Sequence, residues 1–148
     1  MDNIVVQSND PIVNDQDQAL CHLFFHCCLE DEKFSNAEMD DLSGKIVALG
    51  LQPRVNIREE LVRYRSYRPG ITDERGYLKR LIQEINPVND LALYSYCVEL
   101  CLDDPLLDPR EETLLNMIRE ELGIAPEAGD IINRLIAQRK TAEIQKIF

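Results

Sequence analysis

The sequence has no tryptophan, few aromatic residues and no long apolar run, and each absence narrows the classes of protein that it can be. Aromatic residues make up 6% of the chain, and it has only 6 Gly and 7 Pro. The low content of Gly and Pro excludes collagen-like and low-complexity chains. The 45% of apolar residues is enough for a packed core. The longest apolar run, residues 19–29, contains His22 and His26 and is shorter than the roughly 20 residues that a membrane-spanning helix needs. The polar, acidic first residues lack the basic and then apolar pattern of a secretory signal.

Positive charge is also scarce, and the number of cysteines is odd. The 27 acidic residues outnumber the 16 basic ones, which gives a net charge of −11. Such a chain is repelled by nucleic-acid phosphates and anionic membranes, so we expect neither nucleic acid nor direct membrane insertion. Only residues 54–80 reverse the sign, with eight bases against four acids.

The chain has five cysteines, Cys21, Cys27, Cys28, Cys97 and Cys101. They lie among apolar residues, where free thiols behave as small hydrophobes, so they predict a reducing, cytoplasmic location.

Two segments set 73 positions apart resemble each other. Residues 19–51 align without a gap with residues 92–124, so that Ala19 pairs with Ala92 and Gly50 with Gly123. The alignment keeps apolar, acidic and Gly or Pro positions in phase, which favours an internal duplication over chance similarity between two amphipathic hairpins. Each copy is expected to form a helix, an acidic loop and a second helix.

Apolar residues recur at helical spacing through most of the chain. In each copy the first helix has an apolar stripe, and the second is expected over about residues 36–49 or 109–122, ended by Gly50 or Gly123. Two further helices are expected between the copies, over about 55–67 and 73–85, separated by Arg68, Pro69 and Gly70, and a last helix over about 127–140. We therefore predict an all-α, compact bundle of about seven helices, forming a single domain over 16–148 after a flexible segment 1–15.

The repeated acidic loops, residues 29–38 and 102–111, carry the most informative chemistry. Hard divalent cations prefer several carboxylate oxygens at short range, and a turn with Asp104, Asp108 and Glu111 can supply them. The alternative is purely structural, because Asp108 and Glu111 also match a helix N-cap with a glutamate at the third helical position. Capping does not account for Asp31 and Asp104, which leaves both interpretations open.

The pattern of these loops resembles the TerB-like tellurite-resistance family. Residues 92–124 carry most of the resemblance and residues 19–51 a weaker version of it. The resemblance implies an all-α, internally duplicated domain that is linked to tellurite resistance and chemical stress and binds a divalent metal. The acids at the matching positions are Asp31, Glu38, Asp104, Asp108 and Glu111. Where the family usually has Gly after the first acid, this chain has Glu32 and Pro105, and Ser35 replaces an expected Asp.

Histidine and cysteine pairs offer two alternative sites. His22 and His26 are four residues apart, with Glu30 one turn further, and this spacing can hold a transition metal. A homodimer interface is one way to complete such a site. The stripe lies roughly opposite the apolar face, so it is expected to face solvent or another helix. Cys97 and Cys101 fall on the inward stripe, where packing is the simpler interpretation.

The basic middle of the chain combines seven Arg or Lys residues with Tyr64, Tyr67 and Tyr77. Arginine and tyrosine suit protein interfaces, although the acids among them favour a solvated helix surface with local ion pairs. No phosphate-binding glycine loop, nucleophile elbow or metalloprotease helix is present, so no enzyme is predicted.

The leading hypothesis is a non-enzymatic, TerB-like module that binds a divalent metal and acts in a stress response with a protein partner. The sequence does not distinguish Ca, Mg, Mn and Zn as the metal. The alternative is a helical scaffold domain that docks an acidic partner through the basic helices without a metal.

Overall fold

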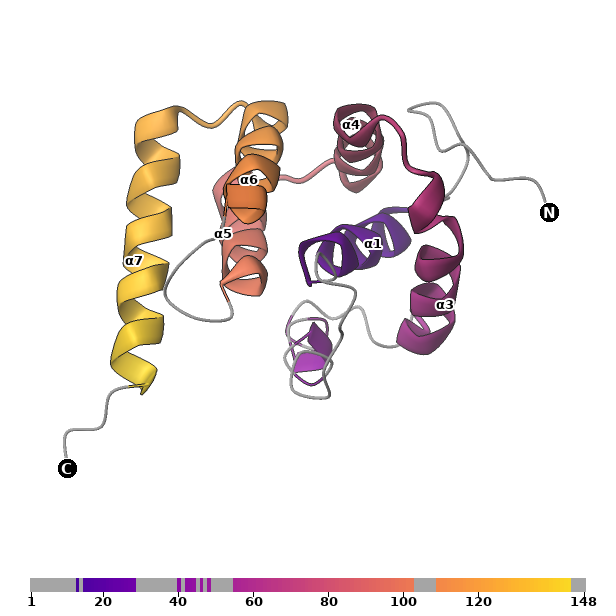
Figure 1. Ribbon diagram of the computed structural model, residues 1–148, viewed down its shortest axis with the longest axis horizontal. Helices are drawn as coiled ribbons and strands as arrows, with labels where there is room; N and C mark the ends of the chain where they lie inside the picture. The colour runs from indigo at the N-terminus through magenta and orange to yellow at the C-terminus, as the bar shows by residue number, and fades with distance from the viewer. Residues whose placement is uncertain are drawn as a thin grey trace. The chain divides into compact units, whose positions relative to one another are not determined.

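The structure is a computed structural model, and it describes residues 13, 15–28, 40, 42–44, 46, 48, 55–102 and 109–144. Within these ranges the regular structure is helical, which confirms the predicted all-α class (Figure 1). None of the helices in these ranges combines the length and the apolarity needed to cross a bilayer. The predicted flexible segment 1–15 lies almost entirely outside the described residues.

The chain forms two compact units, Met1–Asn86 and Pro87–Phe148. In the first unit, helix α1 (Gln16–Cys28) packs against both α3 (Ile57–Tyr67) and α4 (Glu74–Ile85). Residues 40, 42–44, 46 and 48 are helical, in the range where the second helix of the first copy is predicted, and their apolar side chains Leu42 and Ile46 are fully buried. The predicted single-domain boundary at 16–148 stays a prediction.

Local signals explain where α3 and α4 begin and end. The side chains of Asn56 and Asp73 accept hydrogen bonds from the backbone N–H groups of Glu59 (3.2 Å) and Gly76 (3.0 Å), so each acts as the N-cap of its helix. Between the two helices, η1 (Arg68–Gly70) is a single 3-10 turn at the predicted break. The helices predicted over 55–67 and 73–85 are therefore confirmed to within two residues at each end.

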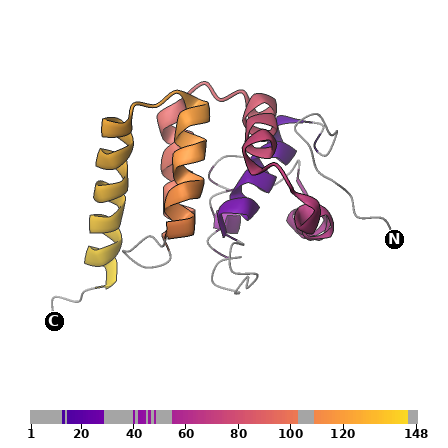
Figure 2. The same ribbon diagram turned by 45° about the horizontal axis from the view of Figure 1, so that its top comes forward.

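In the second unit, α5 (Asp90–Cys101) packs against both α6 (Pro109–Leu122) and α7 (Pro126–Ile144) (Figures 1 and 2). The bounds of α6 match the prediction, with Pro109 at its first position. Gly123 follows with a φ of +71°, a left-handed conformation that glycine adopts without steric cost. At the C-terminal end of α5, the ammonium of Lys140 donates hydrogen bonds to the backbone carbonyl groups of Glu99 and Leu102.

Helix boundaries follow the 73-residue offset of the two copies. Helix α1 is described as far as Cys28, and α5 ends at Cys101, which is the equivalent position because 28 plus 73 is 101. The starts differ by one residue, because Gln16 plus 73 corresponds to Asn89, the N-cap of α5.

Candidate functional site

Helix α1 carries two histidines one turn apart, and both are buried. The exposed fraction is 0% for His22 and 5% for His26. Of the two predicted surroundings, solvent or another helix, the structure shows the second, since their partners lie on α3 and α4. Every residue of α1 from Cys21 to Cys27 is buried, so the single inward stripe predicted for this helix is too narrow.

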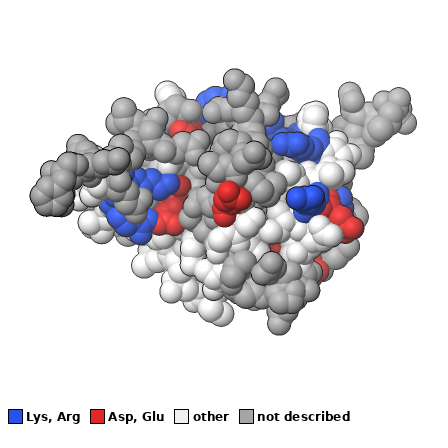
Figure 3. Space-filling view, turned by 90° about the horizontal axis from the view of Figure 1, so that it is seen from below, with Lys and Arg blue, Asp and Glu red and all other residues white. Residues whose placement is uncertain are grey.

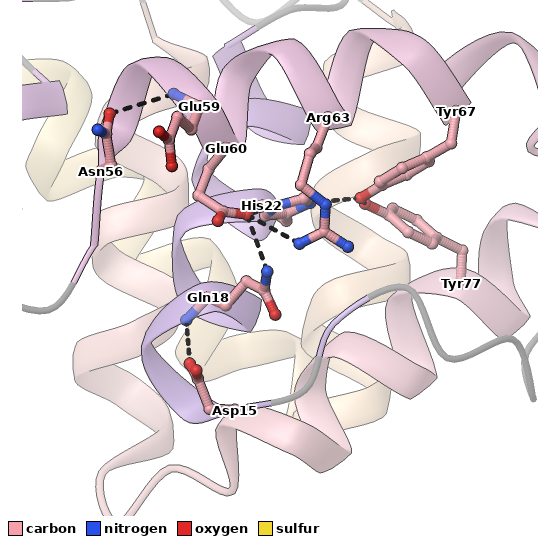
Figure 4. A network of polar contacts seen from close by, with 9 residues as sticks. All are labelled: Asp15, Gln18, His22, Asn56, Glu59, Glu60, Arg63, Tyr67 and Tyr77. Atoms are coloured by element: carbon pink, nitrogen blue, oxygen red, sulfur yellow. Dashed lines mark hydrogen bonds and ion pairs between the residues drawn. The ribbon is translucent and has the colours of Figure 1, made fainter.

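His22 joins a carboxylate to a pair of phenols. Its Nε2 lies 2.7 Å from Oε1 of Glu60, and its Nδ1 lies 2.6 Å from Oη of Tyr67. The hydroxyl of Tyr67 in turn contacts the hydroxyl of Tyr77 on α4. Figure 4 shows Glu60 and Tyr67 reaching from α3 toward the imidazole on α1. We call Glu60, His22, Tyr67 and Tyr77 the inner relay.

The charge on Glu60 sets the direction of every hydrogen bond in the inner relay. Burial alone would raise the pKa of this carboxyl, but hydrogen bonds from His22 and Gln18, together with nearby positive charge such as that of Arg63, outweigh burial and hold the pKa below its ordinary value. As a carboxylate Glu60 only accepts, so Nε2 of His22 donates to it. Burial lowers the pKa of His22, which leaves the ring neutral and Nδ1 an acceptor. Tyr67 therefore donates to Nδ1, and Tyr77 donates to Tyr67.

Two further side chains fix the Glu60 carboxylate. Gln18 Nε2 donates to Oε1 at 3.0 Å, and a guanidinium nitrogen of Arg63 lies 3.3 Å from the same oxygen (Figure 4). Gln18 is itself held at the start of α1, where its backbone N–H donates to Asp15 at 2.7 Å. With only 16% of its side chain exposed, Glu60 is a nearly enclosed anion that is satisfied by three donors.

His26 makes the same kind of chain one turn along α1, which we call the outer relay. Its Nε2 lies 2.8 Å from Oε2 of Glu74, and its Nδ1 lies 2.7 Å from Oη of Tyr64. Arg68 donates from Nε to that same phenol oxygen at 3.1 Å. Because 44% of the Glu74 side chain is exposed, against 16% for Glu60, the outer relay is more open to solvent than the inner relay.

The aromatic rings of the two relays pack against one another. The rings of His22 and Tyr67 are stacked, with centroids 5.6 Å apart. Tyr64 meets both histidines edge-on, at 6.1 and 6.0 Å, and the ring of His26 lies 5.3 Å from that of Tyr77. Burial raises the pKa of all three tyrosines above the ordinary value of 10.0, so the phenols stay protonated and act as donors at neutral pH.

These contacts correct one sequence-based prediction and confirm another. Tyr64, Tyr67 and Tyr77 were grouped with the arginines as a solvated helix surface, but all three are buried. They face α1 because its histidines supply the partners that buried hydroxyl groups need. The predicted local ion pairs are present, between Arg63 and Glu60 and between Arg80 and Glu84.

Most of the acids predicted to bind metal lie outside the described residues. Among them are Asp31, Glu38, Asp104 and Asp108, together with Glu30. Glu111 is described and lies half-buried in the first turn of α6. In the ranges that the structure describes, no three His, Cys, Asp or Glu side chains are grouped so that they could hold a metal ion. Both ring nitrogens of His22 and of His26 are engaged by Glu and Tyr side chains.

The cysteines behave as the sequence predicts. All five are free thiols, and Cys97 and Cys101 are buried in the inward face of α5. Burial, with a smaller contribution from the Glu60 charge, raises the pKa of Cys21 to about 12, which makes it an unreactive thiol. The burial of Cys97 and Cys101 agrees with the predicted packing role of these two side chains.

Comparisons with protein-family models, with curated proteins and with solved structures found no match to this chain. The function is therefore inferred from the geometry of its own residues.

Proposed function

We propose that this chain is a non-enzymatic helical interaction domain that docks an acidic protein partner through the outward face of α3. Arg58, Val62 and Arg65 lie on one side of this helix and are all exposed. Val62 is 69% exposed and lies between the two arginines on this side. Exposed apolar area with flanking arginines is typical of protein interfaces.

The opposite side of α3 supports the proposal, because it holds the helix rigidly. Glu60, Tyr64 and Tyr67 are bound to the two histidines of α1, so the outward face is presented on a fixed backbone. A preorganised surface loses less conformational entropy on binding than a mobile one does. Figure 3 shows Lys and Arg side chains at the right of the view, with Asp and Glu side chains beside them. The net charge of −11 disfavours nucleic acid as the occupant of this face.

The test is affinity capture from an extract of the source cells with three forms of the full chain. The double variant Arg58→Gln with Arg65→Gln removes two charges from the α3 face. Its control, Arg110→Gln with Arg134→Gln, removes two exposed charges from α6 and α7. We expect the wild type and the control to retain the same acidic protein, released by salt, and the α3 variant to lose it. Equal retention by all three forms would contradict the proposal.

Divalent-cation binding through the acidic loops is the second proposed function. The starts of α1 and α5, which agree to within one residue at the offset of 73, support the internal duplication on which it rests. The resemblance to the TerB-like family extends this proposal to a role in tellurite or chemical stress, with Asp104, Asp108 and Glu111 as the main ligands.

Calorimetric titration separates the cation proposal from the capping alternative. Ca²⁺, Mg²⁺, Mn²⁺ and Zn²⁺ are titrated into the wild type, into Glu111→Gln and into Glu112→Gln, which changes an exposed neighbour on the same helical turn. We expect heat and a raised melting temperature with at least one metal, lost in Glu111→Gln and kept in Glu112→Gln. Silence for all four metals would remove this proposal.

A further inference from the structure

A surface recess lies where the outer relay reaches solvent. Its volume is about 310 Å³, and the described residues that line it come from the end of α1, from η1 and from the start of α4: His26, Arg68, Ile71, Thr72 and Glu74. This volume is near the lower end of the range for small-molecule sites, so it suits a ligand of a few heavy atoms better than a nucleotide. All five of these lining residues belong to the first unit.

Arg68 provides a fixed cation in the recess. Its Nε is held by the phenol oxygen of Tyr64 at 3.1 Å, and that phenol is held by His26. Among the described residues, no side chain or carbonyl binds the two terminal nitrogens of the Arg68 guanidinium. A guanidinium that is anchored through Nε presents a planar pair of N–H donors, and a carboxylate fits this pair with two hydrogen bonds.

Glu74 places an anion in the same recess. Its Oε2 accepts from Nε2 of His26, and 44% of its side chain is exposed. A simple anion that approaches Arg68 is repelled by this carboxylate, and a simple cation that approaches Glu74 is repelled by the guanidinium. A molecule that carries both charges avoids either repulsion, because each of its charges faces an opposite charge in the recess.

We propose that this recess binds a small zwitterion of the α-amino-acid class. The ligand carboxylate pairs with Arg68, its ammonium group pairs with Glu74, and Ile71 contacts its side chain. Thr72 adds a hydroxyl at the rim. The site is separate from the α3 face of the proposed function, because none of Arg58, Val62 and Arg65 lines the recess.

The test follows the NMR signals of Ile71 and Thr72 in the full chain during titration with three probes: L-alanine, acetate and methylammonium. We expect saturable shifts with L-alanine, and binding about tenfold weaker for acetate and for methylammonium, since each makes only one of the two ionic contacts. Acetate that binds as tightly as L-alanine would overturn the zwitterion assignment. The same titration with L-alanine is repeated on an Arg68→Gln variant. If the variant shows the same signal shifts as the wild type, Arg68 does not bind the ligand and the proposed site is wrong.

Removing the charge of Glu74 should strengthen the binding of one probe, acetate, and an unfolded variant would not show such a gain. In Glu74→Gln the repulsion of anions is gone, so acetate should bind more tightly than it binds to the wild type while L-alanine binds more weakly. Lys79→Gln is the control, because it removes an exposed charge from the same helix outside the recess. Unchanged or weaker acetate binding in Glu74→Gln would contradict the proposed role of Glu74.

Discussion

Replacing Tyr67 with phenylalanine tests the direction of hydrogen bonding in the inner relay. The hydroxyl of Tyr67 donates to Nδ1 of His22 and accepts from the hydroxyl of Tyr77. Its removal therefore leaves two buried polar groups without partners, an imidazole nitrogen and a phenol hydroxyl. Each orphaned group costs about 1–3 kcal/mol, so we expect the free energy of unfolding to fall by about 2–6 kcal/mol.

Tyr77→Phe is the matched control, because it deletes the same atom from the other end of the same bond. Tyr77 only donates to Tyr67, which keeps its own donation to His22. No donor is orphaned, and the loss is that of one hydrogen bond, about 1 kcal/mol. Burial alone predicts no such difference, since Tyr77 is buried at least as fully as Tyr67.

Urea denaturation at neutral pH, followed by far-ultraviolet circular dichroism, measures both free energies. We expect Tyr67→Phe to be the less stable variant by more than the error of the extrapolation. A Tyr77→Phe protein that is equally or less stable would refute the assigned direction. It would mean that Tyr67 donates to Tyr77 and that His22 Nδ1 carries the proton.

Two further predictions concern pH and the glycines. Burial holds the pKa of His22 below its ordinary value of 6.5, so the unfolded chain binds this proton more readily, and the melting temperature should fall as the pH drops below 6.5. His22→Gln should flatten this part of the pH profile. Below pH 4.5 the melting temperature should fall further, because the lowered pKa of Glu60 means that this carboxyl takes up a proton more readily in the unfolded chain than in the folded one. Gly123→Ala should lower the free energy of unfolding by about 1–2 kcal/mol because of its positive φ. Gly44→Ala, at an exposed helical position with open space around it, should raise that free energy by about 0.5–1 kcal/mol in the same urea assay.

The helices could be predicted from the sequence because their ends are set by local chemistry. Pro109 begins α6 and Gly123 follows its end, and Asn56 and Asp73 cap α3 and α4 within three residues of their own positions. None of these signals needs a distant residue. The apolar periodicity of α5 also predicts that Cys97 and Cys101 are buried, and the structure confirms this.

The two relays could not be predicted in the same way, because each joins residues 38 to 48 positions apart. Periodicity assigned α1 one buried stripe and placed the histidines opposite it. Since α3 and α4 both pack on α1, that opposite side is buried as well. The sequence does contain one signal, since His22 and His26 are spaced about one helical turn apart, and so are Tyr64 and Tyr67.

The two relays also fix how α1 lies against its neighbours. Apolar packing tolerates small shifts along a helix, whereas a buried carboxylate or phenol without a partner is costly. A shift of α1 by one turn, about 5.4 Å, would leave one of the two Glu and Tyr pairs without an imidazole. We infer that the paired histidines specify this register. The same register sets the outer relay at the recess, where Tyr64 holds the guanidinium of Arg68 in place.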